Sequence, residues 1–140
     1  MKPLPPGSTI GILGGGQLGR MLSIAAAQLG FDVCILTDEE DSPASRVSAH
    51  TIVADYHDAD ALKRFAQQVQ VVTTEFENVP ADTARTLVEA GASVHPNPEA
   101  FAIAQDRVLE KRFFNDTGIA TAPFAEVNSR ADLDAALKQI

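Results

Sequence analysis

Three glycines, Gly14, Gly16 and Gly19, lie where a short apolar run is followed by a longer amphipathic stretch. The run 9–13 contains no charged residue, which is typical of a parallel strand buried on both faces. In 17–29, apolar residues recur at spacings of three and four, which indicates a helix. A glycine turn between strand and helix lets backbone N–H groups approach a phosphate at the helix N-terminus. The pattern therefore predicts either an anion-binding turn or a tight turn without a ligand.

The same stretch predicts which side of the helix packs inward. Its large apolar residues gather on one face, which we expect to lie against the sheet: Leu18, Met21, Leu22, Ala25 and Leu29. Gly30 then supplies a C-terminal stop.

Strand and helix patterns alternate along the next part of the chain. Short apolar runs predict strands at 31–37, 51–54, 71–74 and 93–95. Amphipathic stretches predict helices at 60–69 and from Pro80 onward, the latter turning Ala84, Leu87 and Val88 inward. A further helix start is expected at Ser42, because Pro43 follows it. The alternation predicts an α/β fold with a Rossmann-like, doubly wound parallel sheet.

The pattern changes after residue 97. Asn97-Pro98-Glu99 has the order of a helix start, and 107–116 continues as a second helix. A strand is predicted at 124–127 and a last helix from Ser129 to Gln139. We expect one domain over 1–97 and, over 98–140, hinge helices with the first elements of a next domain, so that the chain is a piece of a longer polypeptide.

Composition narrows the class of protein. The 140 residues contain 11 Lys+Arg and 19 Asp+Glu, a net charge of −8 that opposes attraction to nucleic acid or anionic membrane. No signal peptide or apolar run of about 18 residues is present, so we expect a cytoplasmic protein without a membrane span. The single cysteine, Cys34, and the three histidines have no metal-ligand spacing, and we predict no metal site.

A second candidate site follows the predicted strand at 71–74. Glu75 and Glu77 share a face of extended backbone there, with Asn78 next to them, at the end of the strand where open α/β sheets bind ligands. Their oxygens can accept hydrogen bonds from an amine or from hydroxyls. Alternatively, Glu77 or Asn78 caps the helix that follows Pro80.

Two other polar positions have competing interpretations. Asp38 ends the second predicted strand, where a dinucleotide fold places a carboxylate for the ribose hydroxyls, although its acidic run is also typical of a solvated loop. Arg107 lies between two helical stretches, where it can bind a polyphosphate or form a surface ion pair with Asp106 or Glu110.

Three segments together resemble one family. They are Gly14-Gly15-Gly16-Gln17-Leu18-Gly19-Arg20-Met21-Leu22, then Glu75-Phe76-Glu77-Asn78-Val79-Pro80, then Gln105-Asp106-Arg107 continuing to Gly118-Ile119-Ala120-Thr121-Ala122-Pro123. This combination resembles the 5-(carboxyamino)imidazole ribonucleotide synthases, ATP-grasp ligases of purine biosynthesis. The domain over 1–97 would then be their pre-ATP-grasp domain.

The resemblance implies a reaction and roles for particular residues. ATP and bicarbonate would form carboxyphosphate, and its CO₂ unit would be captured by the amine of 5-aminoimidazole ribonucleotide. The turn at Gly16, Gln17 and Leu18 would bind the ribonucleotide phosphate through its backbone, Glu75 would hold the aminoimidazole group, and Arg107 would contact ATP. The family's Mg²⁺ ligands and most of its ATP site would lie beyond residue 140, so no catalytic residue is assigned within this chain and the chain alone is expected to be inactive. The family also implies a homodimer.

Two other functions remain open from the sequence alone. The glycine motif and Asp38 also fit a free-standing NAD-binding module. A third possibility is a regulatory protein that kept the fold and lost the activity.

Overall fold

The computed structural model describes residues 3–75 and 78–140, which form two compact units, Met1–Ala102 and Ile103–Ile140. Each unit is described by itself. The expected domain boundary at residue 97 stays a prediction. The glutamate at 77, expected as a ligand or a cap, lies outside the described residues.

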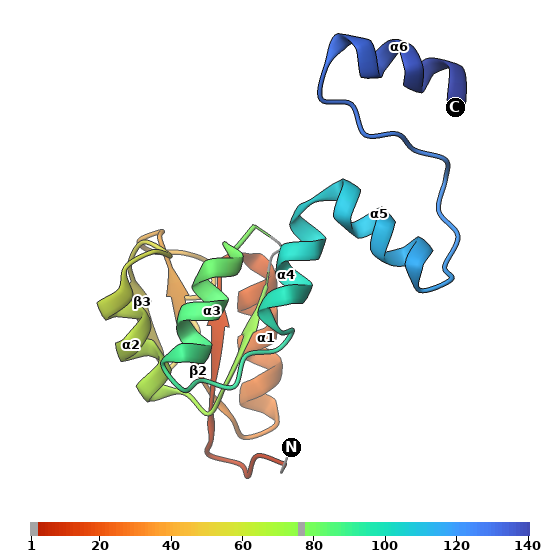
Figure 1. The fold of residues 1–140 in the computed structure, drawn as a ribbon. Coiled ribbons are helices and arrows are strands. Elements are labelled where there is room, and N and C mark those ends of the chain that lie inside the picture. Colours follow the sequence, from red (N-terminus) through yellow and green to blue (C-terminus); the bar gives the residue numbers. More distant parts are fainter. Residues whose placement is uncertain (1–2, 76–77) are drawn as a thin grey trace. The chain divides into compact units, whose positions relative to one another are not determined.

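In its described residues, the first unit has four strands, and four helices begin in it. The strands are β1 (Thr9–Leu13), β2 (Asp32–Thr37), β3 (His50–Val53) and β4 (Val71–Thr74). The helices are α1 (Gln17–Gln28), α2 (Ala59–Gln68), α3 (Ala81–Glu89) and α4 (Pro98–Gln105). These elements confirm the predicted β-α alternation (Figure 1).

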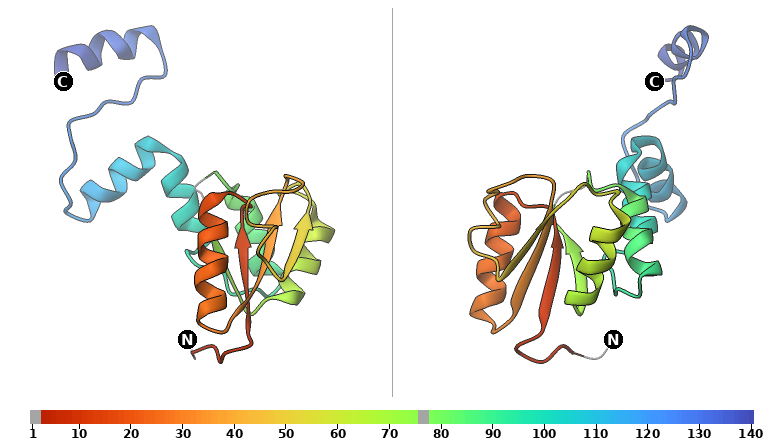
Figure 2. Two further views of the ribbon diagram at one scale, coloured as in Figure 1. Left: turned by 180° about the vertical axis from the view of Figure 1, so that it is seen from behind. Right: turned by 90° about the vertical axis from the view of Figure 1, so that its left-hand side faces the viewer.

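The four strands form one parallel sheet in the order β3-β2-β1-β4. Leu13 pairs with Leu36 and with Thr74, so the strands end at nearly the same level. Helix α1 covers one face, and α2 and α3 cover the other (Figure 2). The carboxyl ends of the strands thus bring the segments after residues 13, 37, 53 and 74 to one edge of the sheet.

The core has a layer on each side of the sheet. On the α2 and α3 side, Phe65 and Leu87 pack with Leu36 and Val72, all of them fully buried. Phe101 of α4 joins this layer. The α1 side has a thinner layer that includes Ile12, Ile35 and Ala26.

The prediction for the inward face of α1 is wrong. Gly19, Ser23 and Ala26 are the buried residues of this helix. The residues expected inside point away from the sheet: Leu18 is 56%, Met21 57% and Leu29 70% exposed, and Leu22 and Ala25 are also exposed. The small inner residues let the helix approach closely, since a Cβ on Gly19 would lie 3.0 Å from the carbonyl oxygen of Gly14.

Three further local predictions differ from the structure in the first unit. The segment 42–48 forms turns instead of a helix, and the N–H of Ala44 donates to the carbonyl of Gly15 (2.9 Å). Segment 93–95 is a single bridge from Val94 to Val72 and not a fifth strand. Pro96 follows and has no N–H with which to continue the ladder. Val88, expected inside α3, is 46% exposed.

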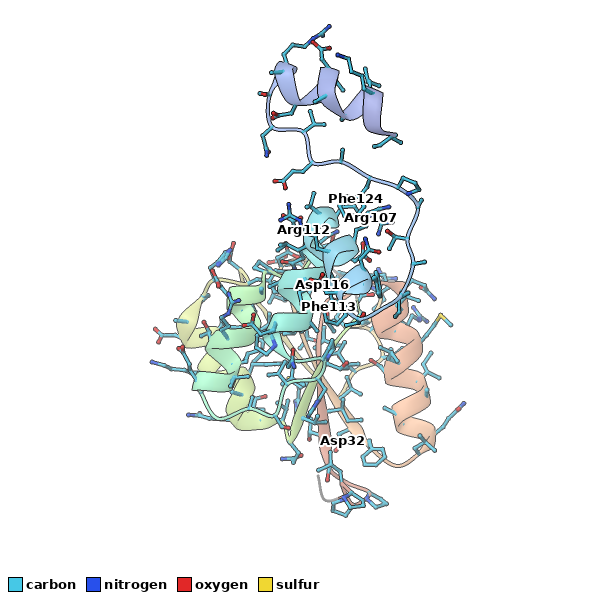
Figure 3. The ribbon with its side chains drawn as sticks, turned by 45° about the vertical axis from the view of Figure 1, so that its right-hand side comes forward. Asp32, Arg107, Arg112, Phe113, Asp116 and Phe124 are labelled. Atoms are coloured by element: carbon cyan, nitrogen blue, oxygen red, sulfur yellow. The ribbon has the colours of Figure 1, made fainter. Side chains whose placement is uncertain are left out.

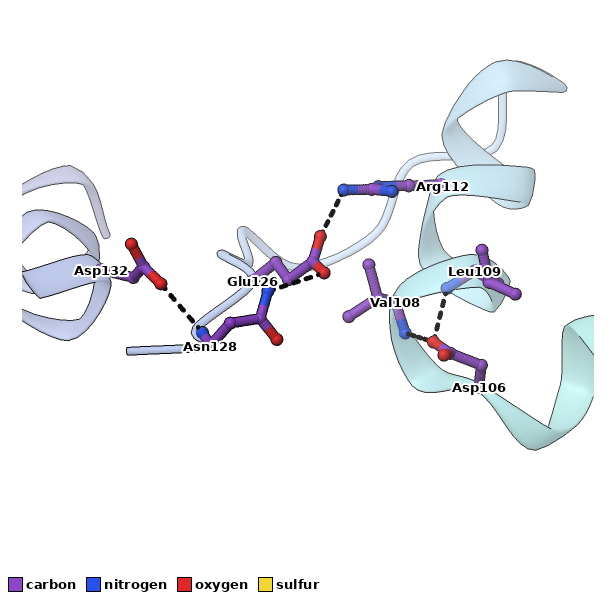
Figure 4. Close-up of polar contacts among 7 residues, drawn as sticks. All are labelled: Asp106, Val108, Leu109, Arg112, Glu126, Asn128 and Asp132. Carbon is purple, nitrogen blue, oxygen red and sulfur yellow. Dashed lines mark hydrogen bonds and ion pairs between the residues drawn. The ribbon is translucent and has the colours of Figure 1, made fainter. Parts of the chain in front are cut away.

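The second unit contains α5 (Arg107–Asp116) and α6 (Arg130–Gln139), as predicted. The strand expected at 124–127 does not form, and the second unit contains no described strand with which it could pair. The link between the helices is fastened to α5 by side chains. The ammonium of Lys111 lies 5.3 Å from the centre of the Phe124 ring, and Arg112 pairs with Glu126 at 2.5 Å (Figure 4). No described helix is long and apolar enough to cross a membrane.

Candidate functional site

The turn between β1 and α1 is built from glycines for steric reasons. Gly14 has φ 104°, a conformation that L side chains rarely adopt, and its N–H donates to the carbonyl of Leu36 (2.9 Å). A Cβ on Gly15 would lie 2.7 Å from Oγ1 of Thr37 and closer still to the hydroxyl of Ser42. The turn is therefore compressed against β2 and the segment after it, which fixes the start of α1.

The carboxylate of Glu75 caps helix α1 from the end of β4. The N–H of Gly16 donates to Oε1 (2.9 Å) and the N–H of Gly19 donates to Oε2 (3.3 Å). Gly16 is the N-cap residue and has no side chain of its own to offer. A Cβ on Gly16 would lie 2.7 Å from Oε1, so glycine there leaves the space that the carboxylate occupies. The structure therefore brings together two of the predicted candidate sites, the glycine turn and Glu75.

Two donors of the same turn stay available for a ligand. The backbone N–H groups of Gln17 and Leu18 have no acceptor among the described residues, and both residues are exposed. The positive end of the α1 dipole lies at these groups and attracts an anion. At the start of α1, two backbone N–H groups therefore donate to the carboxylate of Glu75, and two others can donate to a ligand.

A cleft of about 230 Å³ opens beside this capped turn at the carboxyl edge of the sheet. It is lined by residues that end or follow the four strands: Gly15, Gly16, Thr37, Asp38, Glu39, Tyr56 and Glu75. Three of these carry carboxylates, so the cleft favours hydrogen-bond donors such as amines and hydroxyls.

The Tyr56 hydroxyl is neutral over the physiological pH range. Burial, chiefly, and the nearby charges of Asp38, Glu75 and Glu39 raise the pKa of Tyr56 to about 12, despite a lowering hydrogen bond with the Thr37 side chain. It can therefore act as a donor beside the carboxylates. Thr37, Glu39 and Tyr56 were not predicted as site residues from the sequence. Their position just at or after strand ends was the available signal.

Asn78 is exposed and does not cap α3, whose N-cap is Pro80 without a side-chain hydrogen bond. The cap expected of it is therefore absent. Cys34 is fully buried, and burial raises the pKa of its thiol to about 11, so it is a core residue and not a nucleophile. In the described parts of the chain, no three His, Cys, Asp or Glu side chains are grouped so as to hold a metal ion.

Arg107 is the first residue of α5 and lies in the second unit (Figure 3). Its side chain is 77% exposed and pairs with Glu110, whereas Asp106 caps the helix by accepting from the N–H groups of Val108 (2.8 Å) and Leu109 (3.0 Å) (Figure 4). Of the two expected ion-pair partners, the structure thus selects Glu110.

A cleft of about 260 Å³ lies along this side of α5. It is lined by Arg107, Glu110, Lys111, Phe114, Ile119, Ala120 and Thr121. Two cations beside apolar side chains can hold an anionic group with an attached ring.

The first unit is a parallel α/β domain whose glycine turn, helix start and carboxylate converge at the carboxyl edge of its sheet, which defines a Rossmann-like domain. The ribonucleotide synthetase preATP-grasp domain matches residues 7–105, and the chain belongs to this family.

Three similar proteins carry the same function in their names. The N5-carboxyaminoimidazole ribonucleotide synthase of Brucella melitensis is 51% identical over 134 residues, which cover 96% of this chain and 37% of that protein. Among solved structures, the Staphylococcus aureus synthetase complexed with ADP matches with TM-score 0.90 and 37% identity, covering 97% of this chain and 37% of that one. The Aspergillus clavatus synthase in complex with ADP and 5-aminoimidazole ribonucleotide matches with TM-score 0.81 and 30% identity, covering 96% and 36%. The chain therefore spans little more than a third of these relatives.

Proposed function

We propose that this chain is the N-terminal part of an ATP-dependent ligase that carboxylates 5-aminoimidazole ribonucleotide with bicarbonate in de novo purine biosynthesis. ATP and bicarbonate form carboxyphosphate and ADP. The amine of the ribonucleotide takes up the CO₂ unit and phosphate leaves, which gives 5-carboxyaminoimidazole ribonucleotide. The relatives named above support this proposal, since their names state this product and one of them binds this substrate together with ADP.

The observation that carries the proposal is the pairing of Glu75 with the start of α1. The free N–H groups of Gln17 and Leu18 suit the substrate phosphate, in the turn that begins at Gly16. Glu75 uses one bond on each oxygen to cap α1, and its remaining lone pairs can accept from the exocyclic amine. One turn thereby offers donors to the anionic end of a ribonucleotide and acceptors to its amine.

For ATP, the proposal assigns Arg107, with Lys111 in the same cleft. The pairing of Arg107 with Glu110 is exposed to solvent, and such a pair exchanges for a phosphate at little cost. Among the described residues no three His, Cys, Asp or Glu side chains are grouped to hold a metal ion, and the proposal gives them no role in binding Mg²⁺. Phosphoryl transfer depends on metal and on positive charge around the γ-phosphate, and we expect this chain by itself not to hydrolyse ATP.

The proposal includes a homodimeric, cytoplasmic enzyme that acts on small molecules and does not bind nucleic acid or membrane. The net charge of −8 supports the absence of binding to polyanions. An NAD-binding module is the second candidate, because Asp38 lines the cleft beside Gly15 and Gly16.

Ligand-induced thermal stabilisation separates the two candidates. We expect 5-aminoimidazole ribonucleotide to raise the melting temperature and NADH to leave it unchanged, since a ligand at one hundred times its Kd stabilises by about 2.7 kcal/mol. Glu75→Gln should weaken the response to the ribonucleotide, whereas Glu89→Gln, an exposed carboxylate at the end of α3, should not. Stabilisation by NADH alone would refute the proposal.

The assignment of Arg107 has its own test. Arg107→Ala should weaken binding of ATP much more than binding of 5-aminoimidazole ribonucleotide, measured by titration calorimetry. Equal effects on both ligands, or none on either, would remove this residue from the ATP site.

A further inference from the structure

The start of α1 holds a full negative charge where the proposed function places an anion. Both oxygens of Glu75 accept from backbone N–H groups of this turn, Oε1 from Gly16 (2.9 Å) and Oε2 from Gly19 (3.3 Å). The N-terminus of a helix corresponds to about half a positive charge. One carboxylate therefore more than offsets the helix dipole, and the turn with its capping side chain is anionic.

The backbone and the side chain of Glu75 are both held in place. The backbone N–H donates to the carbonyl of Leu13 (3.0 Å), which extends the pairing of β4 with β1 up to the turn. The carboxylate fills the space left by the absent side chain of Gly16, since a Cβ there would lie 2.7 Å from Oε1. Glu75 cannot leave this position without breaking the two hydrogen bonds that cap α1. The negative charge is therefore a fixed part of the site.

The neighbouring charges add to the effect of Glu75. Three charged side chains in the described part of the chain line the cleft beside the turn, Asp38, Glu39 and Glu75, and each of them is a carboxylate. Helix α1 has one basic residue, Arg20, and no acidic one. A single cation leaves the three carboxylates in excess. An anion that enters this cleft is therefore repelled by the side chains that line it.

A ligand offsets this repulsion when it brings hydrogen-bond donors for the carboxylates. Each oxygen of Glu75 accepts one bond from the turn and can accept another. Sulfate has no proton to donate at neutral pH. On the N–H groups of Gln17 and Leu18, it would displace water from the carboxylate beside it and give no donor in return. A ribonucleotide brings hydroxyls and an amine together with its phosphate, so the site can distinguish anions by the donors that they carry.

We propose that Glu75 is a specificity-determining residue, which excludes simple anions from the start of α1 and admits a phosphate only when the same molecule carries donors for the carboxylate. The inference rests on the proposed function, because it concerns the ribonucleotide site assigned there. The class of ligand that Glu75 selects is a phosphate ester with amine or hydroxyl groups. Inorganic anions without such groups are rejected.

Titration calorimetry with sulfate, at constant ionic strength, tests the proposal. We expect Glu75→Gln to bind sulfate at least about tenfold more tightly than the wild type does, because like charges a few ångström apart near a protein surface repel by more than this factor. The same substitution should weaken binding of 5-aminoimidazole ribonucleotide. A residue that only kept the turn in shape would cause a loss for both ligands, and that result, or equal binding of sulfate by both chains, would overturn the proposal.

Two further variants separate the charge of Glu75 from its other effects. Glu75→Asp keeps the charge on a shorter side chain, so it should still exclude sulfate; a gain as large as that of Glu75→Gln would show that vacated N–H groups, and not the lost charge, admit the anion. Glu89→Gln, at an exposed position near the end of α3, should leave sulfate binding unchanged. An equal gain in this control would make the effect one of net charge. Either of these two gains would overturn the proposal.

The sulfate measurements involve no ribonucleotide, which keeps this inference distinguishable from the proposed function. A wild-type chain that does not bind 5-aminoimidazole ribonucleotide would refute the proposed function, whatever sulfate does. A wild-type chain that binds the ribonucleotide, and binds sulfate as tightly as Glu75→Gln does, would leave that function standing and remove the specificity role of Glu75. Far-UV circular dichroism establishes that each variant is folded before it is titrated.

Discussion

Replacement of Glu75 with glutamine removes the charge at the start of α1 and keeps the shape of the side chain. The carboxylate accepts from Gly16 at 2.9 Å and from Gly19 at 3.3 Å. A hydrogen bond to a charged group contributes about 1.5–3 kcal/mol, and a neutral one about 0.5–1.5 kcal/mol. The amide oxygen of glutamine can accept from one of the two N–H groups, and the change from a charged to a neutral hydrogen bond costs about 1 kcal/mol. The NH₂ group of glutamine cannot accept from the other N–H group. That second bond is long and partly solvated, so its loss adds about 1 kcal/mol.

We therefore expect Glu75→Gln to lower the free energy of unfolding by about 2 kcal/mol. For a unit of this size this corresponds to a fall in Tm of about 10 °C. Urea unfolding followed by far-UV circular dichroism measures the effect, because the chain has no tryptophan.

Glu89→Gln is the matched control, since Glu89 is exposed and near a helix end where its charge caps nothing. We expect it to change stability by less than about 0.5 kcal/mol. If Glu75→Gln costs no more than this control, Glu75 does not cap α1, and the geometry that supports the ribonucleotide site is wrong.

Two further predictions concern the core and the cleft. Gly11→Ala should lower the free energy of unfolding in urea by about 1–3 kcal/mol, because the added Cβ would lie 2.7 Å from Cζ of Phe65. In a Phe65→Leu background the same substitution should cost less. An equal cost in that background would contradict the steric explanation. Tyr56 is the one tyrosine of the chain, and since its pKa is raised to about 12, ultraviolet absorbance should show no ionisation of the native protein at pH 10. The folded state then holds the Tyr56 proton more tightly than the unfolded state does, so the free energy of unfolding should fall as pH rises from about 10 to about 12. Ionisation of the native protein near pH 10 would show that the hydroxyl is not shielded.

Local patterns were sufficient for most elements of the first unit. The run 9–13, the glycine turn and the stretch 17–29 predicted β1 and α1 to within one residue. The alternation also predicted the parallel sheet, because strands separated by helices of about ten residues require crossover connections. These features depend on periodicity and turn chemistry, which nearby residues determine.

Predictions that depend on contacts with residues distant in the sequence were less successful. Segments 93–95 and 124–127 have strand-like sequences, yet the first makes a single bridge and the second belongs to a unit without a described strand. A strand requires neighbours to take its backbone hydrogen bonds, and sequence alone does not supply them. The inward face of α1 was misjudged for a related reason. Periodicity finds an apolar stripe but does not say whether the sheet or another molecule covers it.

The sequence by itself determined the α/β alternation, the glycine turn and the presence of a carboxylate after β4, because each of these depends on residues close together in the chain. Only the tertiary structure decided that Glu75 caps α1, since 59 positions separate it from Gly16 and their contact exists only once β4 lies beside β1. The tertiary structure also decided that Gly19, Ser23 and Ala26 are the buried residues of α1, and at Gly19 the close approach of the turn leaves no room for a larger side chain. It thereby left the leucines and Met21 of α1 exposed.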